Sequence, residues 1–277
     1  GSPQQREKWL PKMGRGEALG CFGLSEPDYG SNPAGMATIA RKKGKNYVLN
    51  GQKMWITNGT IADMAVIWAK LDGEIRGFIV EADRPGYRAT SIKRKFSYRT
   101  SPTAFIDLKN CEIPQTNILP KAFGLKSVFQ CLNHARYGVA WGALGSSIAC
   151  YQEARNFAVN RKVFDRPVAS YQLVQDQLTR MLVEITKAQL ICLHLGRMLD
   201  DGHATPSQIS LAKLNNVREA IKIAHTARDI TGARGILADH HVIRHLCDLE
   251  AVSTLEGTAG MHTLILGQEI TGIPAFK

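Results

Sequence analysis

Residues 174–199, VQDQLTRMLVEITKAQLICLHLGRML, decide the fold of the second half of the chain. Their apolar side chains are spaced alternately by four and three residues: Val174, Leu178, Met181, Ile185, Ala188, Cys192, Leu195 and Leu199. This spacing puts them on one face of an α-helix. We therefore expect a long helix that buries this face against other helices and ends at Asp200-Asp201-Gly202.

The helical pattern of apolar residues continues on both sides of that segment. Turn signals become rare after Pro120, and Pro206-Ser207 offers the start of a further helix. One face of that helix is predicted to carry Ile209, Leu211, Leu214, Val217 and Ile221. The pattern predicts an all-helical domain from about residue 120 to the end.

Residues 17–119 have a different pattern, with short apolar runs separated by turn pairs. The pairs are Asn50-Gly51, Asp72-Gly73 and Pro85-Gly86. Asn-Gly and Asp-Gly tolerate the positive φ of tight hairpins, so this region is predicted to be a small domain of antiparallel strands. Before it, residues 4–10 resemble the end of a helix, which Pro11 and the Gly14/Gly16 pair are expected to stop.

Composition limits the class of protein. The 277 residues are 44% hydrophobic and 21% charged, and no apolar run is long enough to span a bilayer. The six cysteines form no Cys-x-x-Cys pair, which argues against a zinc ribbon or a disulfide framework and favours a reducing compartment. The first residues do not have the pattern of a signal peptide.

The formal net charge of +11 fits a solvated basic face, an anionic surface or a polyphosphorylated ligand. Nucleic-acid binding is less favoured, because no aromatic residues are interleaved with the basic ones.

Three short segments carry candidate chemistry. Residues 254–258 read TLEGT, with one carboxylate among small residues; alone, such a glutamate is more often a helix cap than a base. Residues 22–31 read FGLSEPDYGS, a turn-rich loop with many backbone donors and hydroxyls. Residues 54–59 read MWITNG, an aromatic followed by a hydroxyl at a strand end.

Together these segments resemble the acyl-CoA dehydrogenase family, and within it the glutaryl-CoA dehydrogenase branch. The resemblance extends over essentially the whole chain. It continues through residues 133–138, Arg161, Phe164, Gln172, residues 241–245 and residues 270–273.

The resemblance implies an α+β fold, with a small antiparallel β-barrel-like domain followed by an all-α up-down four-helix-bundle domain. The implied limits are 1–16 for a remnant of an N-terminal helical domain, 17–119 for the middle β domain with the flavin and acyl-CoA site, and 120–277 for the C-terminal helical domain with the base and the oligomer interface. The N-terminal helical domain of the family, which supplies a wall of the acyl pocket, is expected to be missing here.

The implied activity is the FAD-dependent α,β-dehydrogenation of an acyl-CoA thioester, most like oxidation of glutaryl-CoA with decarboxylation to crotonyl-CoA in lysine and tryptophan degradation. Glu256 is the implied base, and apolar neighbours such as Leu255 would make it more basic by desolvating it. The Glu256 N–H would stabilise the enolate oxygen, and the flavin would accept the hydride. An electron-transferring flavoprotein is the implied acceptor, and a homo-oligomer, a tetramer in the family, the implied assembly. The implied compartment is the mitochondrial matrix in a eukaryote or the cytoplasm in a bacterium.

The resemblance also assigns binding residues. Those implied for FAD are Phe22, Gly23, Leu24, Ser25, Glu26, Pro27, Asp28, Tyr29, Gly30, Ser31, Trp55, Ile56, Thr57, Arg161, Phe164, Gln172, Thr258 and Phe276. Those implied for acyl-CoA are Ser31, Phe129, Gln130, Cys131, Leu132, Asn133, His134, Ala135, Arg136 and Gly257. Arg161, Phe164 and Gln172 would reach the FAD of a neighbouring subunit. Arg161 alone also fits a surface salt bridge, and Arg136 also fits an acidic neighbour.

A metal site at His240, His241 and His245 is rejected, since no Cys or acidic residue completes a ligand set. Residues 232–235 are interpreted as a helix end, not a phosphate loop.

Several positions depart from the glutaryl branch. Leu255 stands where that branch has Tyr, Ala259 and Gly260 stand where it has His-Asp, and Asp165 stands where Gly follows Phe164. These departures leave the decarboxylation open. They also leave open two alternatives, an acyl-CoA oxidase and a non-catalytic scaffold of the same fold.

Overall fold

The computed structural model describes residues 1–275, which fall into two compact units. The sheet unit comprises Gly1–Lys95 and Arg99–Gln130, and the helical unit comprises Phe96–Tyr98 and Cys131–Lys277. The division comes later in the sequence than the expected limit at residue 119, because β8 (Ile118–Phe123) pairs with β5 (Glu74–Glu81) and so belongs to the sheet.

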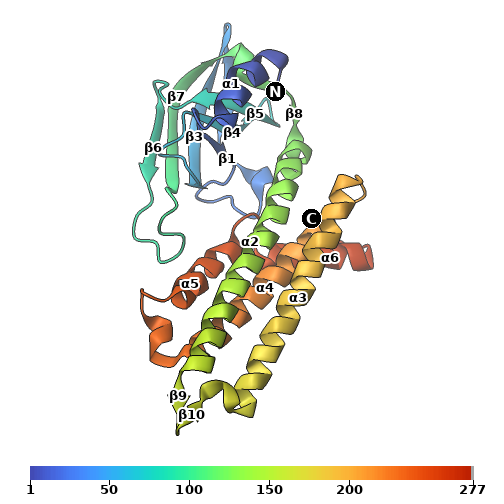
Figure 1. The fold of residues 1–277 in the computed structure, drawn as a ribbon. Coiled ribbons are helices and arrows are strands. Elements are labelled where there is room, and N and C mark those ends of the chain that lie inside the picture. Colours follow the sequence, from blue (N-terminus) through green and yellow to red (C-terminus); the bar gives the residue numbers. More distant parts are fainter. Residues whose placement is uncertain (276–277) are drawn as a thin grey trace. The chain divides into compact units, whose positions relative to one another are not determined.

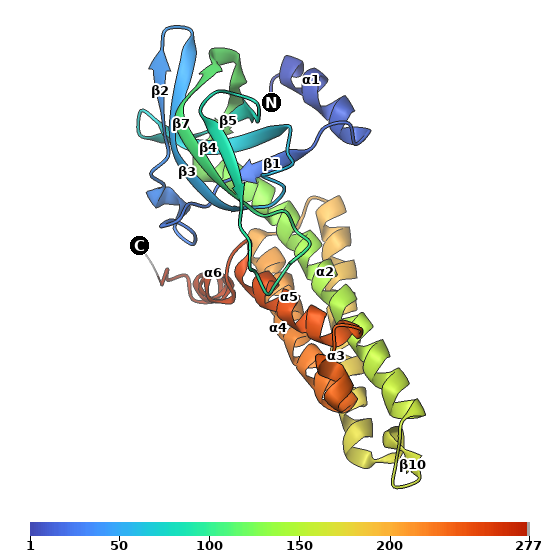
Figure 2. The same cartoon turned by 90° about the vertical axis from the view of Figure 1, so that its left-hand side faces the viewer.

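The sheet unit consists of one eight-stranded sheet with the helix α1 (Pro3–Gly14) outside the strands (Figure 2). The other strands are β1 (Gly20–Gly23), β2 (Ile39–Lys43), β3 (Asn46–Ile56), β4 (Met64–Leu71), β6 (Tyr87–Ser91) and β7 (Ala104–Pro114), with short 3₁₀ turns at Pro33–Gly35 and Gln115–Asn117. The order is β6-β7-β3-β2-β4-β5-β8, and β1 pairs with β4. Most pairs are antiparallel as expected, but β1–β4 and β2–β4 are parallel.

The turn pairs gave two correct predictions and one wrong one. Asp72-Gly73 joins β4 to β5, and Pro85-Gly86 lies between β5 and β6. Asn50-Gly51, by contrast, lies inside β3 at a shift of its register with β7. A Cβ on Gly51 would lie 2.5 Å from Thr38 Oγ1, so this glycine allows close packing instead of making a turn.

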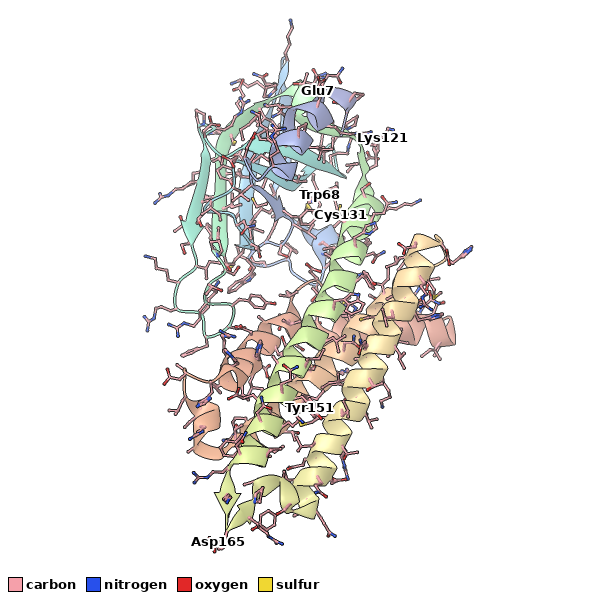
Figure 3. All side chains as sticks on the ribbon, viewed as in Figure 1. Glu7, Trp68, Lys121, Cys131, Tyr151 and Asp165 are labelled. Carbon is pink, nitrogen blue, oxygen red and sulfur yellow. The ribbon has the colours of Figure 1, made fainter. Side chains whose placement is uncertain are left out.

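The core of the sheet unit is mostly apolar and contains one buried ion pair. Leu49, Ile67, Phe78, Ile106 and Ile113 are fully buried in it. Trp68, which lies among the strands in Figure 3, makes an edge-to-face contact with Phe22. The alternation of β3 also turns Lys53 inward, where it is fully buried.

Long helices form the helical unit (Figure 1). They are α2 (Gly124–Asn160), α3 (Gln172–Asp200), α4 (Pro206–Thr231), α5 (His241–Thr254) and α6 (Ala259–Thr271); a small hairpin of β9 (Lys162–Val163) and β10 (Arg166–Pro167) and short 3₁₀ turns at Val168–Ser170 and Gly232–Ile236 complete it. Helices α3, α5 and α6 each contact α4. The α+β fold expected from the sequence is confirmed, with α6 as a shorter helix next to the bundle.

The expected seam of α3 is confirmed: Met181, Ile185, Ala188, Cys192 and Leu195 are buried. The helix ends at Asp200, as predicted.

The predicted apolar face of α4 was partly wrong. Ile209 and Val217 are buried, but Leu211 is 46% exposed. The buried face also includes the small residues Ala212, Ala220, Ala224 and Ala227, which let neighbouring helices approach closely. Lys213 and Asn216 are buried on the same helix and hydrogen-bond to main-chain carbonyls of other segments.

The prediction for the end of the first helix was half right: the helix ends at the Gly14/Gly16 pair, but Pro11 does not stop it. The helix α1 continues through Pro11 to Gly14, although proline removes one hydrogen bond of a helix interior. A capping box formed by Ser2 and Gln5 starts the helix, and the Gln5 amide also donates to the carbonyls of Thr116 and Ile118 in the sheet unit. No helix in residues 1–275 is both long and apolar enough to cross a membrane.

Candidate active site

The connection between α5 and α6 holds Glu256 in an unusual backbone conformation. Leu255 caps the end of α5, and Thr258 caps the start of α6 by accepting a hydrogen bond from Met261 N at 3.1 Å. Between the caps, Glu256 has φ +55° and Gly257 has φ +106°. A non-glycine residue with positive φ is strained and needs support from its surroundings.

Two buried cations supply that support. Lys213 Nζ donates to the carbonyls of Leu255 at 2.6 Å and Gly257 at 2.7 Å, and Arg136 Nε donates to the carbonyl of Glu256 at 2.8 Å. Lys213 comes from α4 and Arg136 from α2. Three consecutive carbonyls are therefore held by two side chains from different helices. We call this arrangement the carbonyl clamp.

The carboxyl group of Glu256 itself is free. Its Oε2 is buried and has no hydrogen-bond partner among residues 1–275. Burial raises the pKa of Glu256 above its ordinary value, and the nearby charges of Lys213 and Arg136 oppose this rise without cancelling it. The Glu256 backbone N–H donates to no backbone acceptor in the described part of the chain. One residue thus offers a desolvated base and a free amide donor.

His262 lies under this connection. It is fully buried on α6, and its pKa is lowered to about 3, by burial first and then by Lys213 and Arg136. The ring is therefore neutral at physiological pH. A Cβ on Gly257 would lie 3.0 Å from His262 Nε2, so only glycine fits next to this ring.

A segment of the helical unit that comes from between β6 and β7 completes the surroundings. Tyr98 N donates to Asp248 Oδ1 at 2.6 Å, and Ser97 Oγ donates to the Asp248 carbonyl at 3.3 Å. The pKa of Tyr98 is raised, by burial first and then by the charges of Asp248 and Glu256. Its phenol therefore stays protonated near Glu256.

In the sheet unit, a buried ion pair joins the two predicted flavin segments. Lys53 Nζ donates to Glu26 Oε1 at 2.8 Å and to the Leu24 carbonyl at 3.0 Å. The Glu26 carboxylate also accepts from Ala37 N at 2.6 Å and Thr38 N at 3.1 Å. Met54 N donates to the Ser25 carbonyl at 2.8 Å, which ties the loop of residues 22–31 to β3. The sequence-predicted loop and Trp55 are thus brought together.

The end of β3 presents groups that suit a flat aromatic ligand. Trp55 has φ +65° and is 57% exposed, a rare position for such a large apolar side chain. Thr57, two residues on, is also exposed and forms no side-chain hydrogen bond within residues 1–275. An indole face and a free hydroxyl fit a flavin ring, which stacks on one and hydrogen-bonds to the other.

Comparisons with known proteins agree with this geometry. Residues 123–271 match the family described as acyl-CoA dehydrogenase, C-terminal domain, and residues 21–111 match acyl-CoA dehydrogenase, middle domain. The chain belongs to the acyl-CoA dehydrogenase family.

Individual relatives cover nearly the whole chain. Glutaryl-CoA dehydrogenase of Desulfococcus multivorans is 31% identical over 281 residues, which covers 99% of this chain and 72% of that protein. The mitochondrial short-chain specific acyl-CoA dehydrogenase of Homo sapiens is 32% identical over 272 residues, covering 96% of this chain and 66% of that protein. The crystal structure of a glutaryl-CoA dehydrogenase from Mycobacterium smegmatis in complex with FADH2 superposes with a TM-score of 0.99 at 48% identity, covering 100% of this chain and 72% of that one.

These matches confirm the family, the fold and a family cofactor, FAD. They do not choose one substrate, since the glutaryl-CoA dehydrogenase of Desulfococcus multivorans and the human short-chain enzyme are 31% and 32% identical to this chain.

The structure places the other predicted binding residues as follows. Residues 129–136 all lie on α2, with Arg136 buried against the Glu256 carbonyl and Phe129, Gln130, Cys131 and His134 exposed. Ser31 is exposed at the end of its loop. Thr258 is the cap of α6. Phe276 lies outside the described residues.

Arg161, Phe164 and Gln172 gather at the β9–β10 hairpin and the start of α3, far along α2 from Arg136. The 24 residues of α2 between Arg136 and Asn160 span about 36 Å at 1.5 Å per residue. Phe164 is 89% exposed, and Phe164 and Asp165 have φ +50° and +66°. Asp165 marks the tip of the hairpin in Figure 3.

The histidines have partners of ordinary structural kinds. His240 Nδ1 lies 2.8 Å from Glu153 Oε1, and His241 Nδ1 lies 3.1 Å from Arg244 Nη2. Residues 232–236 form a 3₁₀ turn directly after α4, so the interpretation of Gly232–Gly235 as a helix end is confirmed.

Sequence reasoning missed Lys213, His262 and the role of Lys53. A lysine is normally solvated, so both lysines were passed over. The signal was present: Lys213 lies four residues after Ile209 on the buried face of α4, and Lys53 occupies an inward position of β3.

Proposed function

We propose that this chain catalyses the FAD-dependent α,β-dehydrogenation of an acyl-CoA thioester of the glutaryl-CoA type, with Glu256 as the base. The observation that carries the proposal is the Glu256 carboxyl oxygen, which is buried, lacks a partner among residues 1–275 and belongs to a residue fixed by the carbonyl clamp. A carboxylate in that state is ready to accept a proton.

In the proposed reaction, the Glu256 carboxylate removes a proton from the thioester α-carbon. The Glu256 backbone N–H donates to the thioester oxygen as negative charge develops there. When bound, FAD supplies the acceptor for the hydride that leaves the β-carbon. Gly257 has no side chain that would meet His262, so the backbone next to the base can pack closely against that ring.

The residues that would hold FAD are in two groups. Loop 22–31 and Trp55 to Thr57 would receive the ring and its adjoining groups, and the Glu26–Lys53 pair fixes that loop from below. Arg161, Phe164 and Gln172 would contact the FAD of another subunit. The support is their exposure and the length of α2 between them and Arg136. A homotetramer and transfer of electrons to an electron-transferring flavoprotein belong to the same proposal.

The test compares Glu256→Gln with the unchanged protein. Both are loaded with FAD and assayed with glutaryl-CoA and an artificial electron acceptor. The substitution keeps the size of the side chain and removes the base, so kcat should fall at least about a hundredfold while the flavin spectrum persists. Glu250→Gln on the exposed side of α5 is the matched control and should keep wild-type activity. An unchanged rate in Glu256→Gln would exclude Glu256 as the base.

Substrate and acceptor are tested separately. Glutaryl-CoA, butyryl-CoA and longer acyl-CoAs are compared by kcat/KM, and products are identified by mass. Crotonyl-CoA with released CO2 supports the decarboxylating reaction, whereas glutaconyl-CoA without CO2 contradicts it. Hydrogen peroxide formed at the rate of turnover would indicate an oxidase. A protein that takes up no FAD would indicate a scaffold.

A further inference from the structure

We propose that Lys213 is a positioning residue for Glu256. Together with Arg136, Lys213 holds the three consecutive carbonyls of residues 255–257. This inference rests on the function proposed above. It concerns a residue of α4 whose ammonium group donates hydrogen bonds to the backbone of the active-site connection.

The clamp joins parts that are far apart in the sequence. Lys213 is 1% exposed and reaches the carbonyls on both sides of Glu256, while Arg136 reaches the carbonyl between them. A buried lysine loses its hydrogen bonds to water and must replace them with hydrogen bonds to protein acceptors. The two carbonyls can both accept from Lys213 only when the chain turns at Glu256. The buried ammonium therefore specifies the turn, and the turn carries the strain of φ +55° at Glu256.

The choice of acceptor matters for the chemistry. Both cations donate to main-chain carbonyls, and no salt bridge to the Glu256 carboxylate is present in the described residues. A direct ion pair would hold the carboxylate and reduce its tendency to take a proton. By bonding the backbone, Lys213 fixes where the side chain starts and leaves the carboxylate unbound.

Lys213 also contributes a positive charge near Glu256. The charged and titratable groups near Glu256 are Lys213 from α4, Arg136 from α2 and the protonated Tyr98 phenol, while neutral His262 from α6 lies next to Gly257. Removal of Lys213 leaves Arg136 as the one cation in that set. The carboxylate form of Glu256 then becomes less stable relative to the protonated form.

The test uses Lys213→Met, Lys213→Gln and Lys213→Arg. Methionine keeps much of the length without charge or donor, glutamine keeps a donor without charge, and arginine keeps both. Lys222→Met is the matched control, since Lys222 lies on the same helix with its side chain 69% exposed and paired with Glu219.

The first readout needs no turnover. Glutamate labelled at the carboxyl carbon is followed by NMR across pH, and the Glu256 signal is assigned by its loss in Glu256→Gln. The titration midpoint of Glu256 should move upward in Lys213→Met and Lys213→Gln, and return toward that of the unchanged protein in Lys213→Arg. Amide hydrogen exchange at residues 255–258 should accelerate at least tenfold in Lys213→Met, with exchange in α3 unchanged.

The second readout is the pH profile of kcat in the FAD-loaded protein. Near the midpoint of the unchanged protein, Lys213→Met should lose about tenfold in kcat and recover part of it at higher pH, which a merely structural defect would not do. If Lys213→Met does not fold, Lys213→Gln and Lys213→Arg decide by the same readouts.

Two results would overturn the inference: an unmoved Glu256 midpoint in Lys213→Gln, or an unmoved midpoint together with unmoved amide exchange in Lys213→Met. A failure of the proposed function is distinguishable, because then the unchanged protein itself would show no turnover while the NMR titration could still be read.

Discussion

The Glu26–Lys53 pair makes a sharp prediction for the stability of the sheet unit. Lys53 has no exposed side-chain surface and Glu26 has 4%. Lys53→Met removes the cation and leaves a buried carboxylate with the N–H groups of Ala37 and Thr38 as its remaining donors. Breaking a buried ion pair in this way costs about 3–5 kcal/mol. That is a large part of the roughly 5–15 kcal/mol that stabilises a typical domain.

The measurement is urea denaturation followed by tryptophan fluorescence, since Trp9, Trp55 and Trp68 lie in the sheet unit. The double variant Glu26→Gln/Lys53→Met is neutral and retains an amide oxygen for one of the two N–H groups. Its loss should be smaller than the sum of the single losses by about 1–3 kcal/mol. The control is Lys109→Met, which breaks a pair whose lysine is 80% exposed and should cost less than about 1 kcal/mol.

The loss of stability caused by Lys53→Met should also depend on pH. Burial alone would raise the pKa of Glu26, but hydrogen bonds from Lys53 and Thr38 outweigh it and hold the pKa below the ordinary 4.5. The stability that this carboxylate contributes is present above the unfolded-state pKa and is lost as pH falls through the folded-state pKa. The difference between the unchanged protein and Lys53→Met should therefore shrink below about pH 4. A loss under about 1 kcal/mol at neutral pH, or strictly additive single losses, would refute the reasoning.

Three further predictions concern the helical unit. Because burial raises the pKa of Glu256 and the ionised form is the base, kcat should rise with pH through a midpoint above 4.5, and a profile that is flat down to pH 4 would contradict this. Gly257→Ala places a Cβ 3.0 Å from His262 Nε2 at φ +106° and should cost about 1–3 kcal/mol in thermal or urea unfolding, while Gly260→Ala, with its nearest atom at 3.6 Å, should be neutral or stabilising. Asp165→Gly relieves a φ of +66° at the hairpin tip and should stabilise the chain by about 0.5–1 kcal/mol; if the hairpin contacts FAD, it should also slow FAD release in a dilution assay.

Local patterns gave the elements of this fold because each pattern has one dominant physical cause. The seam of α3 follows from a period that only a helix satisfies, and the Asp72-Gly73 turn follows from its tolerance of positive φ, here +51° and +87°. Asn50-Gly51 has the same local signal but lies within β3. There the backbone passes close to Thr38, the residue before β2, and sequence spacing does not report such a contact.

The candidate site, like the fold, could be predicted only in part from the sequence. Glu256 was identified by resemblance, and its burial and free carboxyl oxygen agree with a base. The residues that hold the backbone around Glu256, Arg136 and Lys213, come from two different helices, and their spacing in the sequence does not show that they meet. Arg136 illustrates this: the resemblance implied contact with coenzyme A, whereas the structure gives its Nε to the Glu256 carbonyl, and the contact with coenzyme A stays a prediction.

Lys53 and Lys213 show what the two units share. Each is a lysine at an inward position of a regular element, and each has its pKa lowered to about 8 by burial. Lys53 donates to the Leu24 carbonyl and the Glu26 carboxylate, and Lys213 donates to the carbonyls of Leu255 and Gly257, so each bonds an irregular segment. In an irregular segment, some carbonyls have no hydrogen-bond partner in a helix or sheet. A buried ammonium group has three donors and can bond several acceptors at once. The cost of burying the charge is then tied to the shape of that segment, because any other shape leaves the ammonium without acceptors. A lysine on an apolar face of a regular element is therefore a sequence signal for a nearby fixed loop, and in this chain both such loops carry residues proposed for the reaction.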